Sequence, residues 1–145
     1  MLYLEKPIDF VSEMEQSGSF VEHDGDILLL LRSAHDTYPN QWTLPSGGHM
    51  EGEDKYTAVI REIFEETGLK MQKEDMQFIK TCYMHLEEYG INITYYLFHT
   101  TISERKEIVL NKDEHADFRW VNPQAALTLP LTPYLRECID WVYKK

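Results

Sequence analysis

The sequence is poor in cysteine and has no long apolar run. Its two cysteines, Cys82 and Cys138, are isolated, which disfavours a disulfide framework or a cysteine metal site and predicts buried free thiols. The longest aliphatic run, residues 27–31, is far too short to cross a bilayer, and the N-terminus lacks a basic region leading into an apolar signal core. We therefore expect a cytoplasmic protein without a membrane segment.

Positive charge is also scarce. With 14 Lys and Arg against 25 Asp and Glu, the net charge is −11 and the pI is near 4.9. Such a surface repels a nucleic-acid backbone, whose binding depends on Lys and Arg contacts to phosphates, so a polymeric DNA or RNA partner is disfavoured. A small polyphosphate can still bind where metal ions and a few basic groups neutralise it. The 43% hydrophobic content and the absence of repeats predict one domain over residues 1–145.

Residues 54–67 have the periodicity of an amphipathic helix. Asp54 suits the N-cap and Gly68 suits the left-handed position after the last turn, so the pattern and its end signals coincide. At about 100° per residue, one side carries the apolar residues Tyr56, Val59, Ile60, Ile63 and Phe64. The other side carries Ala58, Arg61, Glu62, Glu65 and Glu66. We expect the apolar side to pack on a sheet and the acidic side to carry the chemistry.

Three glutamates, Glu62, Glu65 and Glu66, converge on that second side. Like charges one turn apart repel each other and raise carboxyl pKa values unless a cation intervenes, and a divalent ion would resolve the conflict. An acidic helix face is more often simply solvated. The preceding loop argues against that interpretation. Its glycines, Gly47, Gly48 and Gly52, permit close approach of the backbone, and Glu53 adds a further acid at the start of the helix.

Together these residues match every fixed position of the pattern G-x5-E-x7-R-E-U-x-E-E-x-G-U, in which U is aliphatic. The matching residues are Gly47, Glu53, Arg61, Glu62, Ile63, Glu65, Glu66, Gly68 and Leu69. This is the Nudix box, and the chain resembles the Nudix hydrolases strongly over residues 42–69 and more weakly elsewhere. The resemblance implies the Nudix fold, an α/β/α sandwich with a mixed β-sheet and the box as a loop-helix-loop beside it.

The resemblance also implies site residues. Glu62, Glu65 and Glu66 would bind metal, Glu62 or Glu65 would act as general base, and Arg61 would fix the carboxylates by pairing with Glu53. Glu114 lies where many members of the family place a further metal-binding or basic Glu; the alternative is an acid in a charged loop. The family also uses a backbone carbonyl from a glycine that is replaced here by Ser46, so either Ser46 or Gly47 would provide it.

The donor set indicates the metal. Carboxylates and a carbonyl, without thiolates or clustered imidazoles, favour Mg²⁺ or Mn²⁺ over Zn²⁺. His49 is beside the site, but a single His there is interpreted as a loop or substrate contact.

The rest of the chain reads as strands before and after the helix. Asp24-Gly25 is a hairpin turn signal between a strand-like stretch at 11–21, interrupted at 17–19, and a buried strand at 27–31. Residues 33–41 read as a loop. Residues 75–85 and 91–102 predict an antiparallel hairpin. Towards the end we expect a charged loop at 103–117, a short strand at 118–121, a helical turn at Asn122-Pro123 and a helix over 132–143. This order independently predicts an α/β sandwich with a mixed sheet.

The implied reaction is hydrolysis of a phosphoanhydride that links a nucleoside diphosphate to another group. The short layout favours a nucleoside triphosphate pyrophosphohydrolase. ADP-ribose, nucleotide-sugar or dinucleoside polyphosphate hydrolysis is the first alternative, and a sensing module without turnover is an alternative of another class. Candidate substrate contacts are Arg32, His49 and Tyr96, with Tyr38 and Tyr95 as further candidates for base stacking. A homodimer is compatible with the sequence, which does not specify the oligomeric state.

Overall fold

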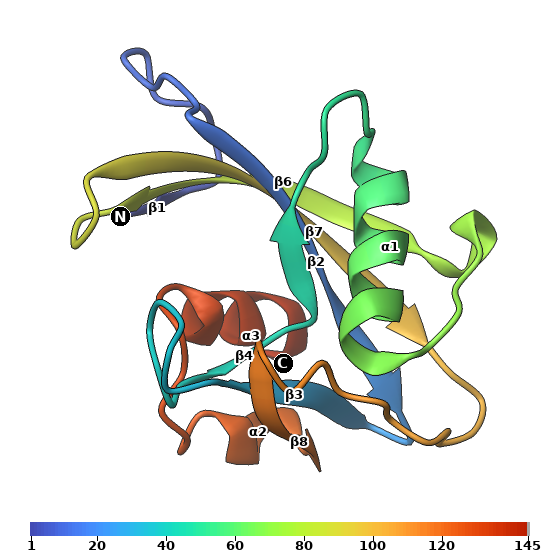
Figure 1. Cartoon of the computed structure of the whole chain (residues 1–145). Helices are drawn as coiled ribbons and strands as arrows, with labels where there is room; N and C mark the ends of the chain where they lie inside the picture. Colours follow the sequence, from blue (N-terminus) through green and yellow to red (C-terminus); the bar gives the residue numbers. More distant parts are fainter. Residues whose placement is uncertain (145) are drawn as a thin grey trace.

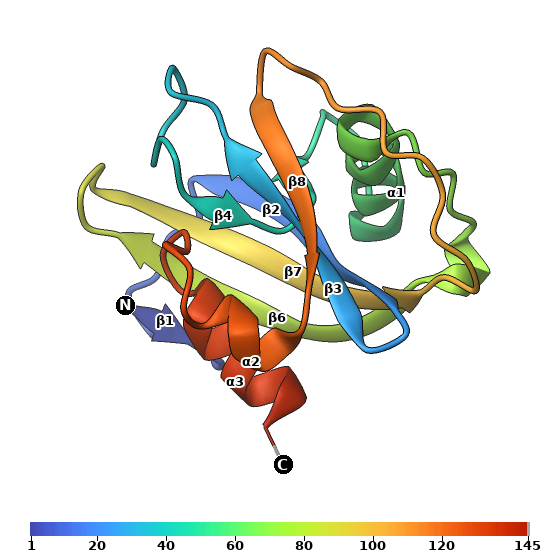
Figure 2. The same ribbon diagram turned by 90° about the horizontal axis from the view of Figure 1, so that it is seen from below.

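The computed structural model describes residues 1–144 and contains a mixed sheet with helices on both faces (Figures 1 and 2). The strands within these residues are β1 (Leu2–Tyr3), β2 (Met14–His23), β3 (Asp26–Arg32), β4 (Trp42–Thr43), β5 (Ser46–Gly48), β6 (Gln77–Leu86), β7 (Ile91–Thr101) and β8 (His115–Val121). The helices are α1 (Lys55–Thr67), a 3₁₀ turn η1 (Lys73–Asp75), α2 (Pro123–Ala126) and α3 (Leu135–Tyr143). The predicted α/β fold class is therefore confirmed.

The sheet is mixed because β2 and β7 run parallel while the other neighbouring strands are antiparallel. Strands follow the order β1-β6-β7-β2-β3-β4, with β5 also paired to β2 and β8 to β3. The β2–β3 hairpin turns at Asp24 and Gly25, both of which have positive φ, as the turn signal predicts. Beyond two residue pairs at its turn the hairpin splays, so that β2 goes on to pair with β5 while β3 pairs with β8 and β4.

Two cores lie on opposite faces of this sheet, and strand alternation assigns residues to them. Phe20, Ile27 and Leu97 point into the core that also contains α3 residues such as Ile139. Their chain neighbours Val21, Leu28 and Phe98 point into the core that includes α1 residues Val59 and Ile63. This arrangement explains why residues 27–30 are all fully buried: helices cover both faces, so there is no solvent side for polar residues. Within residues 1–144, no helix is long and apolar enough to span a membrane.

Helix α1 begins and ends as predicted. The Asp54 side chain accepts a hydrogen bond from the Thr57 amide, and Gly68 closes the helix at φ 79°. The predicted apolar side was wrong at two places: Phe64 is 48% exposed, and Ala58, assigned to the polar side, is fully buried. The buried stripe is rotated towards Ala58 because the helix packs on both β2 and β5. Lys70 lies over the exposed Phe64 ring, 6.0 Å from its centroid.

Three other sequence expectations were wrong in their bounds. Strand β2 is continuous through 17–19, where the lack of a side chain at Gly18 leaves room for the Tyr95 hydroxyl. Strand β8 begins at His115 instead of residue 118. Helix α3 begins at Leu135 instead of Thr132, because the Thr132 amide donates to the Trp42 carbonyl and Leu131 forms a parallel bridge with Trp42, so this stretch is extended. The two cysteines are free and buried, as predicted.

Gly68 gives a direct test of how α1 is terminated. A Gly68→Ala change combines a left-handed backbone with a Cβ only 3.2 Å from the Val109 Cβ, and should lower the free energy of unfolding by about 1–2 kcal/mol. The matched control is Gly25→Ala, which has a similar φ of 83° and no atom near the added Cβ. Urea denaturation should show a larger loss at Gly68; equal losses would mean that the Val109 contact adds nothing.

Candidate metal and hydrolase site

The loop between β5 and α1 is tied to the helix by one side chain, Arg61. Its Nε and Nη2 donate to the two carboxylate oxygens of Glu53 at 2.7 and 2.8 Å, and Nη2 also donates to the Gly48 carbonyl at 2.9 Å. Its Nη1 donates to Glu62 at 2.8 Å and to Glu65 at 3.0 Å. The bidentate pair with Glu53 fixes the loop geometrically, because a planar guanidinium matches two carboxylate oxygens. The expected Arg61–Glu53 pair is thus present.

Charge pairing with Arg61 has a clear effect on Glu53. Hydrogen bonds from Arg61 lower the pKa of the Glu53 carboxyl to about 2, against the cost of its partial burial, and the Met50 amide also donates to it at 2.7 Å. Glu53 is therefore ionised throughout the physiological range, and its charge is directed at Arg61.

Unlike Glu53, Glu62 and Glu66 lie against strand β5. The Glu62 carboxylate lies against Gly47, so closely that any Cβ at that position would collide with it. Glu66 is only 4% exposed and accepts a hydrogen bond from the Ser46 amide at 2.9 Å. Burial raises the pKa of both carboxyls; the neighbouring charges of Glu65 and Glu114 add to this at Glu62, and those of Glu62 and Glu114 add to it at Glu66. Arg61 pairs with Glu62, whereas no lysine or arginine within residues 1–144 forms an ion pair with Glu66.

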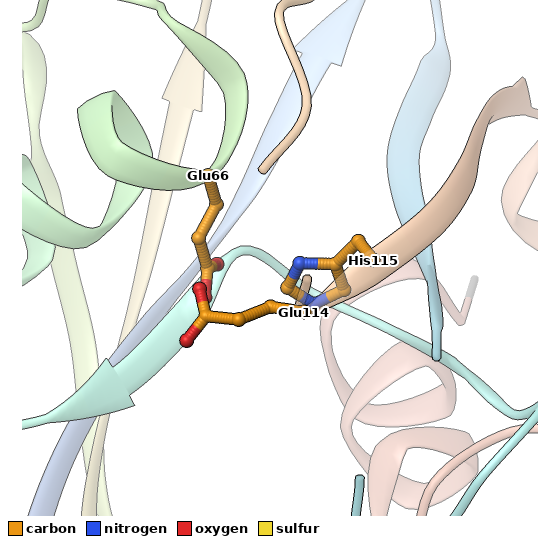
Figure 3. A group of neighbouring side chains, drawn as sticks. All are labelled: Glu66, Glu114 and His115. Carbon is orange, nitrogen blue, oxygen red and sulfur yellow. The ribbon is translucent and has the colours of Figure 1, made fainter. Parts of the chain in front are cut away.

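His115, the first residue of β8, and Glu114, just before it, complete the cluster. One carboxylate oxygen each from Glu66 and Glu114 and one ring nitrogen of His115 lie within 4.8 Å of one another (Figure 3). Burial and the nearby charge of Arg32 lower the pKa of His115 to about 4, so its imidazole is neutral at pH 7. Glu65 is more peripheral, with a side chain 45% exposed that bonds to Arg61.

These residues fit a hard divalent cation. The donors are mainly carboxylate oxygens, and two of the acids are held close together at a cost that a cation would remove. The backbone ligand stays a prediction: Ser46 contacts the cluster through its amide and Gly47 through its packing against Glu62, so both peptides are adjacent to the acids.

His115 was missed by the sequence analysis. Its only sequence signal is its position next to Glu114, just before a strand. The direction of its side chain depends on an irregularity in the β3–β8 pairing between Leu31 and Arg32, which opposes Leu31 to Asp117 and Arg32 to His115. Such a bulge re-aims side chains and cannot be read from strand alternation.

The predicted substrate contacts fall into two separate places. Arg32, Tyr38 and Tyr95 line a cavity of about 150 Å³ between the sheet and α3, and Ser46 lines it too. His49 lines a different, open groove of about 580 Å³ beside the loop. There His49 stacks on Tyr96 with ring centroids 5.4 Å apart and bonds to the Ser17 hydroxyl at 2.8 Å. The structure therefore groups His49 with Tyr96 and separates both from Arg32.

The Arg61–Glu53 pair should produce a specific dependence of stability on pH. Because the folded-state pKa of Glu53 is lowered, its stabilisation is fully present above the ordinary Glu value of about 4.3 and is lost as pH falls towards about 2. Glu53→Gln should cost about 1–3 kcal/mol near pH 7 and should remove that part of the acid dependence. Urea unfolding at several pH values would measure both effects. An identical slope in the two proteins between pH 4 and pH 2 would contradict the assignment.

Comparisons with known proteins agree with this geometry. The family model for the NUDIX domain matches residues 18–142. The chain is 37% identical over 114 residues to the nucleoside triphosphatase NudI of Escherichia fergusonii, covering 72% of this chain and 78% of that protein. It is 32% identical over 113 residues to the nucleoside triphosphatase NudI of Salmonella typhimurium, with the same shares of 72% and 78%.

Solved structures share the fold. A MutT NUDIX hydrolase from Burkholderia pseudomallei superposes with a TM-score of 0.78 at 24% identity, covering 89% of this chain and 97% of that one. A MutT protein from Methanosarcina mazei gives a TM-score of 0.73 at 25% identity, covering 91% and 96%. With the complete box, the match over most of its length and these relatives, the chain belongs to the Nudix hydrolase family.

Proposed function

We propose that this protein is a divalent-metal-dependent nucleoside triphosphate pyrophosphohydrolase. The observation that carries the proposal is the cluster of Glu62, Glu66 and Glu114, in which the buried Glu66 carboxylate lies next to two others. Arg61 is engaged with the loop residue Glu53 and with Glu62, and it does not pair with Glu66. The names of the NudI relatives, nucleoside triphosphatases, support this substrate class. We further propose that residues 1–145 act as one domain and that the protein works in the cytoplasm.

Each residue of the cluster has a proposed role. Glu62, Glu65, Glu66 and Glu114 hold Mg²⁺ or Mn²⁺ together with a backbone carbonyl of Ser46 or Gly47, and Glu62 or Glu65 takes the proton of the attacking water. When bound, such ions neutralise phosphate charge and lower the pKa of a water molecule. Arg61 and Glu53 position the loop and the carboxylates, and Arg61 also limits the repulsion among them.

The cavity beside Ser46 is the proposed nucleoside site. It is lined by aromatic side chains, Tyr38, Tyr95 and Tyr134, and by the hydroxyls of Thr43 and Thr132. Arg32 also lines it and bonds to Asp36 and Thr37 at 3.0 and 2.8 Å, which fixes the guanidinium at the cavity. A nucleotide with its base here would have its phosphates towards Ser46, whose amide bonds to Glu66. His49, which lines the other groove, and Tyr96, which stacks on it, remain candidates for contact with the far end of a substrate.

The first test concerns metal binding and stability. Mg²⁺ or Mn²⁺ at about 100 times its Kd should raise the melting temperature by roughly 5–10 °C, because an ion that binds only the folded state stabilises it by mass action. Glu66→Gln should abolish most of this rise and should lower turnover by about 10²-fold or more. Without metal, the same variant should melt above wild type, because it removes a buried negative charge beside Glu62. Glu107→Gln, an exposed acid elsewhere, is the charge-matched control; equal metal-induced shifts in all three proteins would place the ion elsewhere.

The second test concerns the bond that is cleaved. A nucleoside triphosphate should give a nucleoside monophosphate and pyrophosphate, because Glu62 and Glu66 would hold ions that neutralise the charge developing when water attacks in line. Chromatography of the products and mass analysis after reaction in ¹⁸O-labelled water would identify the attacked phosphorus. Release of a nucleoside diphosphate and orthophosphate would overturn the proposal, and tight binding without any product would favour a sensing module.

A further inference from the structure

His115 is unusual among the histidines of this chain. It is 3% exposed, and its Nδ1 atom has no hydrogen-bond partner within residues 1–144. A buried ring nitrogen without a partner loses the hydrogen bond that water would give it, so its burial is unfavourable unless another group binds it. Natural structures rarely keep such groups without a role.

Three backbone hydrogen bonds hold the chain at Glu114 and His115. The amides of Glu114 and His115 both donate to the Asn111 carbonyl, at 3.1 and 2.9 Å, and the Ser33 amide donates to the Glu114 carbonyl at 3.0 Å. The bulge at the start of the β3–β8 pairing then turns the imidazole towards α1. Figure 3 shows the ring of His115 and the carboxyl groups of Glu66 and Glu114 converging on one region.

We propose that His115 is a nitrogen ligand of the divalent ion, bound together with Glu66 and Glu114. The three donor atoms lie within 4.8 Å of one another, and two ligands on opposite sides of one ion are about 4.2 Å apart, so small side-chain shifts suffice. This inference rests on the metal site of the proposed function and adds a nitrogen donor to its oxygen ligands.

A nitrogen ligand changes which ion the site prefers. Mg²⁺ favours an all-oxygen set, whereas imidazole binds later first-row metals well and Mn²⁺ accepts both donor types. We therefore expect Mn²⁺ to bind more tightly than Mg²⁺. The preference should depend on His115, so its replacement should cost more affinity for Mn²⁺ than for Mg²⁺.

Pulsed EPR of the Mn²⁺-loaded protein tests the ligand directly. Wild type should show a ¹⁴N coupling from a coordinated imidazole, which changes to a ¹⁵N pattern when the protein is labelled with ¹⁵N-histidine; this comparison needs no substitution. His115→Gln should lose the coupling and bind Mn²⁺ about 10- to 100-fold more weakly by isothermal titration calorimetry. The matched control is His49→Gln, which removes the other imidazole near the loop and should keep the coupling.

The outcomes separate this inference from the proposed function. If wild type has no histidine coupling, or if the coupling disappears in His49→Gln instead, His115 is not the ligand, even where Glu66→Gln still weakens Mn²⁺ binding and the acidic site stands. If neither Glu66→Gln nor His115→Gln changes Mn²⁺ affinity, the ion binds elsewhere, and both the inference and the metal site of the proposed function fail.

Discussion

The arrangement of the site depends on how Arg61 divides its hydrogen bonds. It gives two of them to Glu53, one to the Gly48 carbonyl, and the remainder to Glu62 and Glu65. One positive charge therefore stabilises the loop and the near side of the acidic face, but Arg61 gives no hydrogen bond to Glu66. The last turn of α1 contains no basic residue, and the helix dipole adds negative potential there. The negative charge without a cationic partner is therefore greatest at Glu66, which lies next to Glu114 and His115.

The splayed β2–β3 hairpin explains how these groups come together. β2 pairs with β5, whose residues Gly47 and Ser46 contact Glu62 and Glu66, respectively. β3 pairs with β8, which begins at His115 and follows directly after Glu114. Helix α1 packs against β2 and β5. The site therefore lies where the two branches of the hairpin separate, and each branch supplies part of the ligand set.

The local parts of this arrangement could be predicted from the sequence, and the long-range parts could not. Helix α1, its caps at Asp54 and Gly68 and the turn at Asp24-Gly25 all follow from interactions within a few residues. The start of α3 was missed because Leu131 and Thr132 pair with Trp42, some 90 residues away in the chain. The burial of Ala58 and the exposure of Phe64 depend on where α1 rests on β5, which periodicity alone does not specify.

Ser46 shows how nucleoside recognition and metal binding can be linked in this chain. Its amide bonds to the Glu66 carboxylate, while the residue also lines the cavity that contains Arg32 and Tyr38. Its hydroxyl donates to the Leu44 carbonyl at 3.1 Å. Burial raises the pKa of the neighbouring Tyr95 hydroxyl, and a hydrogen bond with the Ser46 side chain opposes that rise. A group that enters the cavity therefore contacts Ser46, whose backbone amide holds the buried Glu66 carboxylate. Because the packed sheet around Ser46 leaves little room for independent movement, the position of Glu66 and the shape of the cavity are determined together.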